Sequence, residues 1–323
     1  MRKQVTIISP VYNEEAVIES FYRELSTVAT SLQTRYSLRF VFVVDRSTDA
    51  TIEVLRGLAG NDPRISVISL SSRFGHQMSL LAGIDHADPA ADALIMMDCD
   101  LQHPPQVIPR LLEQFELGND VVFTVREDTA GQGWLRKMIG NGFYRMLSAL
   151  SKIPIHENAA DFRLISGRVA KLIRSDIRER GLFLRGIFSW IGFRQVGVRF
   201  RAGERAGGRS KYTLSRMLSL ASAGILSFST RPLHLGLFVG IAFGAVGALM
   251  ALWVFAEYFL DSSIPSGWTT LAMLQLTFSA VQLFCMGVLG VYIGGIYEQV
   301  RGRPHYIVDE IIRFDEAREM SHA

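Results

Sequence analysis

Two acidic residues separated by one residue, Asp98 and Asp100, directly follow the apolar run 93–97. In an extended chain, side chains two positions apart point to the same side. Two carboxylates so placed suit Mg²⁺ or Mn²⁺, hard cations that take oxygen ligands and complete their shell with water and substrate phosphates. Gln102 adds a neutral oxygen on the same face if the chain stays extended. His103 is a candidate for a further ligand, but a histidine before two prolines is more often a loop residue. A solvated turn capped by acids is the alternative.

The apolar run before these acids is one of four short β-rich runs that alternate with helical patterns. The predicted strands are residues 5–8, 39–44, 65–70 and 93–97, and the predicted helices are residues 13–32, 51–59 and 77–86. Asn13 is expected to cap the first helix, because acidic residues follow it. The alternation, with near-continuous apolar strands, predicts an α/β fold whose mostly parallel sheet is covered on both faces.

Each predicted strand ends in polar side chains. They are Tyr12, Asn13 and Glu14 after the first strand, Asp45, Ser47 and Asp49 after the second, Arg73 after the third, and Asp98 and Asp100 after the fourth. In open α/β sheets, ligands bind beyond the carboxyl ends of the strands. The four loops therefore predict one binding site at one edge of the sheet.

Two long apolar segments, residues 233–260 and 269–297, lie near the end of the sequence. Because about 20 apolar residues cross a bilayer core, both are predicted to be transmembrane helices, with buried core helices as the alternative. The loop 261–268 between them has no Lys or Arg, whereas arginines flank the pair on its other side. The positive-inside rule therefore places residues 1–211 and the tail 298–323 in the cytoplasm, as parts of a multi-pass protein of the cytoplasmic membrane.

The remaining membrane-related features are a helical pattern at residues 212–232 and a series of glycines in the first apolar segment. The pattern fits a helix in the membrane interface or an ordinary core helix, and its position beside a span favours the interface. The glycines predict close helix packing and a homo-oligomer. The net charge is only +3, which gives no indication of nucleic-acid binding.

The segment 199–211 is cationic and rich in glycine. Its basic residues are Arg199, Arg201, Arg205, Arg209 and Lys211, against the single acid Glu204. Such a loop just before a membrane-facing helix is placed to hold a lipid phosphate at the bilayer surface. General attraction to anionic lipids is the alternative, and the three glycines favour the specific site. Arg126 and Arg163 are weaker candidates for the same phosphate.

Three stretches resemble the successive motifs of family 2 glycosyltransferases. They are ISPVYNEE at residues 8–15, VDRSTD at 44–49 and MDCDLQHPP at 97–105. Further stretches at residues 160–166, 181–193, 207–212 and 290–308 resemble the polyprenyl-phosphate glycosyltransferases, the group that includes dolichyl-phosphate mannose synthase and the bactoprenol glucosyltransferases. The similarity covers residues 4–308, and the two apolar segments suit the bactoprenol branch.

The resemblance implies a GT-A fold, a divalent metal, Mg²⁺ or Mn²⁺, and inverting transfer of one sugar from a nucleotide diphosphate to polyprenyl phosphate. The implied nucleotide-binding residues are Pro10, Tyr12, Asn13, Glu14, Asp45, Arg73 and Asp98, and the implied metal ligands are Asp98, Asp100 and Gln102. The implied catalytic residues are Asp100, Asp161 and Arg163. The acceptor phosphate would be held by Arg126, Arg201, Arg205, Arg209, Ser210 and Lys211.

The sequence also departs from the family pattern. Val44 replaces the first of two acids, Arg46 replaces a glycine, and Arg73-Phe74-Gly75 is one residue short. If a glycine is needed for the backbone there, the nucleotide pocket is altered. Asp161 is interpreted as orienting the acceptor or Arg163 as readily as acting as a base, or else as only pairing with Arg163.

Glucose from UDP-glucose is the first expectation for the donor. Mannose, galactose, an N-acetylhexosamine or aminoarabinose are the alternatives, and a degenerate, non-catalytic nucleotide-sugar-binding membrane protein is another. A processive polysaccharide synthase is disfavoured, because the sequence has only two apolar segments and no Q-x-x-R-W motif.

Overall fold

The computed structural model describes residues 2–127, 159–180, 182–201, 231–260 and 267–313. The chain divides into two compact units. The first contains the sheet and includes the segment from Arg303 onward, and the second contains the two long C-terminal helices. The predicted interfacial helix, residues 212–232, falls almost entirely outside the described residues.

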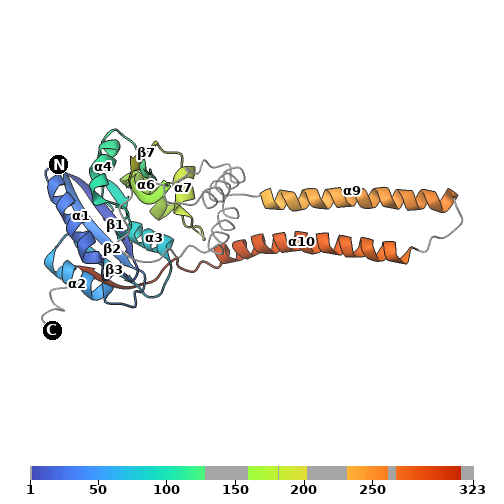
Figure 1. The fold of residues 1–323 in the computed structure, drawn as a ribbon, viewed down its shortest axis with the longest axis horizontal. Coiled ribbons are helices and arrows are strands. Elements are labelled where there is room, and N and C mark those ends of the chain that lie inside the picture. The colour runs from blue at the N-terminus through green and yellow to red at the C-terminus, as the bar shows by residue number, and fades with distance from the viewer. Residues whose placement is uncertain (1, 128–158, 181, 202–230, 261–266, 314–323) are drawn as a thin grey trace. The chain divides into compact units, whose positions relative to one another are not determined.

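The first unit is built on an eight-stranded sheet (Figure 1). Its strands are β1 (Lys3–Val11), β2 (Tyr36–Val44), β3 (Ile65–Leu70), β4 (Ala93–Met96), β5 (Val121–Arg126), β6 (Ala159–Ser166), β7 (Gln195–Phe200) and β8 (Val308–Arg313). Their spatial order is β7-β5-β6-β4-β1-β2-β3-β8. The four strands expected from the sequence pair in parallel, β4 with β1, β1 with β2 and β2 with β3, which confirms the mostly parallel sheet.

Helices cover both faces of this sheet. They are α1 (Ile18–Leu32), α2 (Thr51–Asn61), α3 (His76–His86), α4 (Ile108–Glu116), α6 (Gly167–Ser175) and α7 (Leu184–Trp190), with a 3₁₀ turn at Pro105–Val107. Residues of α1, α2 and α4 share one core cluster with Ile7 and Phe42, whereas Gly83 of α3 lies against Ile8 and Val43. Because neighbouring strand residues face opposite sides, α3 covers the other face.

The first helix begins later than predicted. Helix α1 starts at Ile18 with Val17 at its N-cap, so the prediction that Asn13 caps it was wrong. Asn13 has a positive φ of 54° and lies in a loop. Its side chain bonds another loop instead, because its amide donates to Thr48 Oγ1 at 3.1 Å and its Oδ1 accepts the Thr48 N–H at 2.8 Å.

The sheet is completed by strands for which the sequence pattern gave no signal. Strand β6 lies between β4 and β5 and is antiparallel to both. Strand β8, inside the segment expected to be a cytoplasmic tail, adds to the edge antiparallel to β3. Arg56 of α2 bonds Glu310 of β8 at 3.0 Å, and Tyr306, just before β8, donates to Asp85 of α3 at 2.7 Å. The segment after the second long helix is thus part of the sheet unit.

The second unit contains α9 (Arg231–Leu260) and α10 (Trp268–Val300), which run antiparallel side by side (Figure 1). Among the residues that the structure describes, one stretch, Thr277–Val300, is long and apolar enough to cross a membrane, and α9 holds a shorter apolar stretch, Gly236–Met250. The Cys285 thiol of α10 donates to the Gly236 carbonyl at 3.5 Å. A Cβ at Gly247 would lie 3.0 Å from the Phe278 ring. Two of the predicted packing glycines therefore face α10 of the same chain.

We expect Ile312→Ala to lower the thermal unfolding midpoint of the full-length protein in detergent. Ile312 of β8 is fully buried, and removing a buried isoleucine side chain to Cβ costs about 2–5 kcal/mol. Asp309→Ala changes an exposed residue of the same strand and serves as the control. Equal midpoints for the two variants would contradict the structural role of β8.

Candidate active site

The polar ends of the parallel strands meet at one edge of the sheet. Val11 of β1 pairs with Val44 of β2, and Ile8 pairs with Met96 of β4, so the loops that follow these strands are neighbours. The Asn13 N–H donates to Ser47 Oγ at 3.0 Å. This contact confirms the predicted convergence for the loops after β1 and β2.

The backbone of these loops is unusual. Three non-glycine residues in the described part of the chain have positive φ: Asn13 at 54°, Arg46 at 48° and Leu101 at 61°. They follow β1, β2 and β4 respectively, so all three lie at the same edge. Left-handed backbone costs a non-glycine residue about 1–2 kcal/mol and clusters at functional sites. Its concentration here marks this edge as the candidate site.

Arg46 keeps the backbone conformation that a glycine would adopt easily. Its φ of 48° lies in the left-handed region, and its guanidinium donates to the Ser71 carbonyl at 3.0 Å. The neighbouring Asp45 is buried, and its carboxylate accepts the N–H groups of Phe74 and Gly75 at 2.7 and 2.9 Å. Asp45 thus holds the loop after β3, and contact of Asp45 with a nucleoside stays a prediction.

Other predicted nucleotide-binding residues lie around these loops. The Arg73 guanidinium stacks over the Tyr12 ring at 4.0 Å, which joins the loops after β3 and β1. The Glu14 N–H donates to Thr51 Oγ1 at 3.0 Å. Pro10 is buried at the end of β1, and its carbonyl accepts the Cys99 thiol at 3.6 Å. These contacts hold the loops together, and binding of a nucleotide by these residues stays a prediction.

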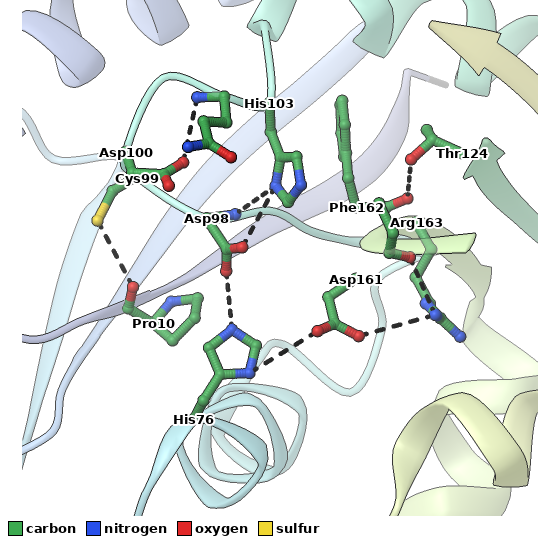
Figure 2. A network of polar contacts seen from close by, with 12 residues as sticks. Pro10, His76, Asp98, Cys99, Asp100, His103, Thr124, Asp161, Phe162 and Arg163 are labelled. Carbon is green, nitrogen blue, oxygen red and sulfur yellow. Dashed lines mark hydrogen bonds and ion pairs between the residues drawn. The ribbon is translucent and has the colours of Figure 1, made fainter. Parts of the chain in front are cut away.

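The expected metal ligands lie in one loop but do not share one extended face. Strand β4 ends at Met96, and the positive φ of Leu101 turns the chain before Gln102, so the assumption of an extended chain was wrong. The Gln102 N–H donates to Asp100 Oδ1 at 3.1 Å, and its Oε1 accepts from Arg126 at 2.6 Å. Asp98 instead turns towards His76 (Figure 2).

This donor set fits a metal that arrives with substrate. The described residues contain no cluster of three or more His, Cys, Asp or Glu side chains suited to a metal ion. Asp98 and Asp100, both only partly buried, offer carboxylate oxygens from one loop. Mg²⁺ and Mn²⁺ are commonly held by one or two carboxylates, with water and phosphate oxygens as the other ligands.

Two imidazoles hold Asp98. His76, the first residue of α3, bonds its Nε2 to Asp98 Oδ1 at 2.8 Å, and Nδ1 of His103 accepts the Asp98 N–H at 3.0 Å (Figure 2). Burial lowers the pKa of His76, but the hydrogen bond and charge of Asp98 and the charge of Asp161 raise it to about 9. Burial raises the pKa of Asp98, and the two imidazoles outweigh this effect, so the pKa is lowered.

His103 is more than a loop residue. It is buried and stacks on Phe162 at 5.3 Å between ring centroids, with Phe200 edge-on at 6.0 Å. Phe162 follows Asp161 in β6, and Phe200 ends β7, where the cationic segment continues. The loop 97–104, which carries the expected metal ligands, is called the metal loop below. The His103 ring packs this loop against β6 and β7.

Strand β6 brings Asp161 to the end of β4. The antiparallel register pairs Met96 with Arg163, and continuing it by two residues sets Asp98 opposite Asp161. Asp161 accepts two hydrogen bonds from Arg185 of α7 at 2.6 and 2.7 Å, and lies 3.8 Å from Arg163 and 4.0 Å from His76. Arg185, not Arg163, is its main partner.

The negative charge of Asp161 is stabilised by the positive charges of the residues around it. Burial raises the pKa of Asp161, but Arg185, with His76 and Arg163, lowers it below its usual range. Burial lowers the pKa of Arg163 to about 10, and the guanidinium lies 4.7 Å from the Phe188 ring. At neutral pH the site therefore holds an ionised carboxylate with two charged arginines, a setting suited to binding phosphate.

The other predicted phosphate-binding residues are only partly described. Arg126 reaches the metal loop through Gln102. Arg201 is exposed, 3.7 Å from Glu127. Arg205, Arg209, Ser210 and Lys211 lie outside the described residues, so their role stays a prediction.

Sequence reasoning did not identify His76 or Arg185; it placed His103 correctly in a loop but did not reveal that its ring is buried. His76 directly follows Gly75 at the end of a predicted loop, so its position beyond a strand was a usable signal. Arg185 lies in the stretch 181–193 already singled out for its resemblance. Asp98 and Asp161, the partners of His76 and Arg185, are 22 and 24 residues away, which is why local patterns did not reveal these contacts.

We expect Arg185→Gln to destabilise the protein by about 3–5 kcal/mol at pH 7, because Asp161 would stay buried without its main cation. The native pairing lowers the pKa of Asp161, so its stabilisation is present above the unfolded pKa and is lost as pH falls. In the variant without Arg185, burial of Asp161 raises its pKa. Protonation of Asp161 at lower pH then removes the buried charge, so the loss of stability relative to the wild type becomes smaller. Thermal unfolding at pH 7 and pH 5 measures the change.

Arg39→Gln is the matched control, because Arg39 is exposed and 3.7 Å from Asp88. A surface pair of this kind is worth at most about 1 kcal/mol. Similar losses for the two variants, or a loss that does not depend on pH, would contradict the buried pairing.

Comparison with known proteins is consistent with this geometry. The family model for glycosyl transferase family 2 matches residues 6–173. The uncharacterized glycosyltransferase YkcC of Bacillus subtilis is 39% identical over 95% of this chain and 94% of its own length. The SfII prophage-derived bactoprenol glucosyl transferase of Shigella flexneri is 37% identical, over 94% and 97%, and a prophage homologue from Escherichia coli is 35% identical, over 95% and 99%. The chain belongs to glycosyl transferase family 2 and is a glycosyltransferase with the GT-A type of fold.

Proposed function

We propose that the protein transfers one sugar from a nucleotide diphosphate, with inversion, to polyprenyl phosphate on the cytoplasmic membrane face. The observation that carries this proposal is the meeting of Asp98 in the metal loop with Asp161 and its arginines. A site of this kind can hold two anionic substrates together. The two bactoprenol glucosyl transferases similar to this chain support polyprenyl phosphate as acceptor and UDP-glucose as the first donor to test.

On the donor side, the stack of Arg73 on Tyr12 supports binding of a nucleobase, and Asn13 and Asp45 stabilise the loops around it. Asp98 and Asp100 would hold Mg²⁺ or Mn²⁺. When bound, such a cation neutralises the charge that develops on the leaving diphosphate. The Gln102 side-chain oxygen already accepts a hydrogen bond from Arg126, so we assign Gln102 to orienting the metal loop rather than to binding the metal.

On the acceptor side, the nucleophile needs no strong base. A phosphate monoester has its second pKa near 6, so it is largely dianionic at neutral pH. One phosphate oxygen attacks the anomeric carbon, and the bond from that carbon to the nucleoside diphosphate breaks. Asp161, with a lowered pKa and two arginine partners, is a poor proton acceptor. We assign it to orienting Arg163 and Arg185 towards the acceptor phosphate.

The long helices would anchor the enzyme where its lipid substrate lies. The apolar stretch Thr277–Val300 supports one span, and the whole of α9, 30 residues long, is the candidate for a second. Two spans return the chain to the starting side. This topology agrees with the pairing of β8 with β3 in the same unit, since both must then lie on one side of the membrane.

We expect membranes containing the protein, given polyprenyl phosphate, Mg²⁺ or Mn²⁺ and radiolabelled nucleotide sugars, to move label from one donor into an organic-extractable lipid. UDP-glucose is compared with the UDP and GDP donors of the alternative sugars. Asp100→Asn should lower the transfer rate at least about 100-fold, because one charged oxygen ligand of the metal is lost. A chelator should abolish transfer, because it removes the metal itself.

Glu113→Gln, an exposed residue of α4, is the control for loss of a carboxylate. Transfer that persists in Asp100→Asn or in the presence of chelator would contradict the metal assignment. Transfer from no donor, with nucleotide still bound, would contradict the reaction itself.

We expect cysteine labelling to reveal two spans. In a background with both native cysteines replaced, Ser263→Cys, between the helices, should react with a membrane-impermeant maleimide in intact cells. Asp309→Cys on β8 should react only after permeabilisation. Labelling of Asp309→Cys in intact cells would contradict the proposed topology.

A further inference from the structure

The N-terminus of α3 joins the two halves of the site. His76 bonds Asp98 Oδ1 through Nε2 at 2.8 Å, and its other nitrogen, Nδ1, lies 4.0 Å from Asp161 Oδ2 (Figure 2). Asp98 belongs to the loop after β4, whereas Asp161 belongs to β6. A single imidazole thus lies between the metal-loop carboxylate and the acceptor-side carboxylate.

The next residue extends this connection to α7. Nε2 of Gln77 lies 3.4 Å from Nδ1 of His76, and its Oε1 accepts the Leu184 N–H at 3.1 Å. Leu184 is buried and precedes Arg185, which binds Asp161 through two hydrogen bonds. The contacts form a closed ring through α3, α7 and β6, and Asp98 of the metal loop joins this ring at His76.

Helix α3 is rigidly held, so it can set the position of His76. Gly83 lies so close to Ile8 of β1 that a Cβ there would be only 2.2 Å away from a side-chain carbon. Near the helix C-terminus, Asp85 accepts hydrogen bonds from Arg178 at 2.7 and 2.9 Å and from Tyr306 at 2.7 Å. A functional side chain on a packed helix is placed more accurately than one on a loop.

We propose that His76 is a positioning residue that sets the separation between Asp98 and Asp161, so that donor sugar and acceptor phosphate meet in register. The Asp98 and Asp161 carboxylates repel each other. The His76 imidazole lies between them and contacts both, so it fixes how far apart they are held. The inference rests on the proposed function, because it gives His76 a task between the donor and acceptor subsites. In this role His76 acts through Asp98 and Asp161, the two carboxylates that it contacts.

The test uses the full-length protein in membranes with His76→Ala, His76→Gln and His86→Ala. We expect His76→Ala to lower kcat about 10–100-fold and to weaken Mn²⁺ binding in the presence of UDP by about tenfold, as loss of a partner behind a metal ligand usually does. The KM for the donor should change much less. His76→Gln restores an N–H donor and should recover most of both losses. His86→Ala, at the other end of α3, should match the wild type.

Mn²⁺ binding, followed by electron paramagnetic resonance, makes this inference separable from the proposed function. If the wild type binds Mn²⁺ with UDP but transfers no sugar, the reaction is wrong, and the Mn²⁺ affinity of His76→Ala still decides the role of His76. Unchanged kcat and Mn²⁺ affinity in His76→Ala would overturn the inference. So would equal losses in His86→Ala, which would indicate general damage to α3.

Discussion

A buried carboxylate is stable only where cations or hydrogen-bond donors surround it, and this constraint shapes the site. Asp161 has a side chain only 12% exposed, and it is balanced by Arg185, with Arg163 and His76 nearby. Removing one partner of such a pair costs several kcal/mol, because the remaining charge keeps its desolvation penalty. The positions of α3, α7 and β6 are therefore tied to one another through the charges they carry.

The sheet provides the frame for this ionic cluster. Strand β1 lies between β2 and β4, and parallel pairing sends all three to the same edge. The antiparallel β6 then enters beside β4, so the start of β6 meets the end of β4 and brings Asp161 opposite Asp98. A purely parallel strand at this place would carry its first residues to the far edge. The one reversal in direction beside β4 is what brings Asp98 and Asp161 together.

The parts of this architecture that follow from local pattern could be predicted. Strands β1 to β4 have continuous apolar runs, and Asp98 and Asp100 directly follow one of them. The remaining strands depend on pairing between distant segments, such as β8 with β3, and no local period encodes that choice. The same reason hides His76 and Arg185, whose partners are 22 and 24 residues away. The proline pair after His103 correctly indicated a loop, but burial of its ring between Phe162 and Phe200 is a tertiary property that no local pattern shows.

Arg46, which departs from the family pattern, adopts a backbone conformation that glycine accepts more easily. A glycine at this place would adopt the left-handed conformation at little cost, whereas arginine loses about 1–2 kcal/mol. The bond from its guanidinium to the Ser71 carbonyl offsets part of that cost and links the loops after β2 and β3. Arg73, two residues after Ser71, is the one that stacks on Tyr12. Arg46 therefore joins the two loops through its side chain while its backbone adopts a left-handed conformation that glycine would also accept.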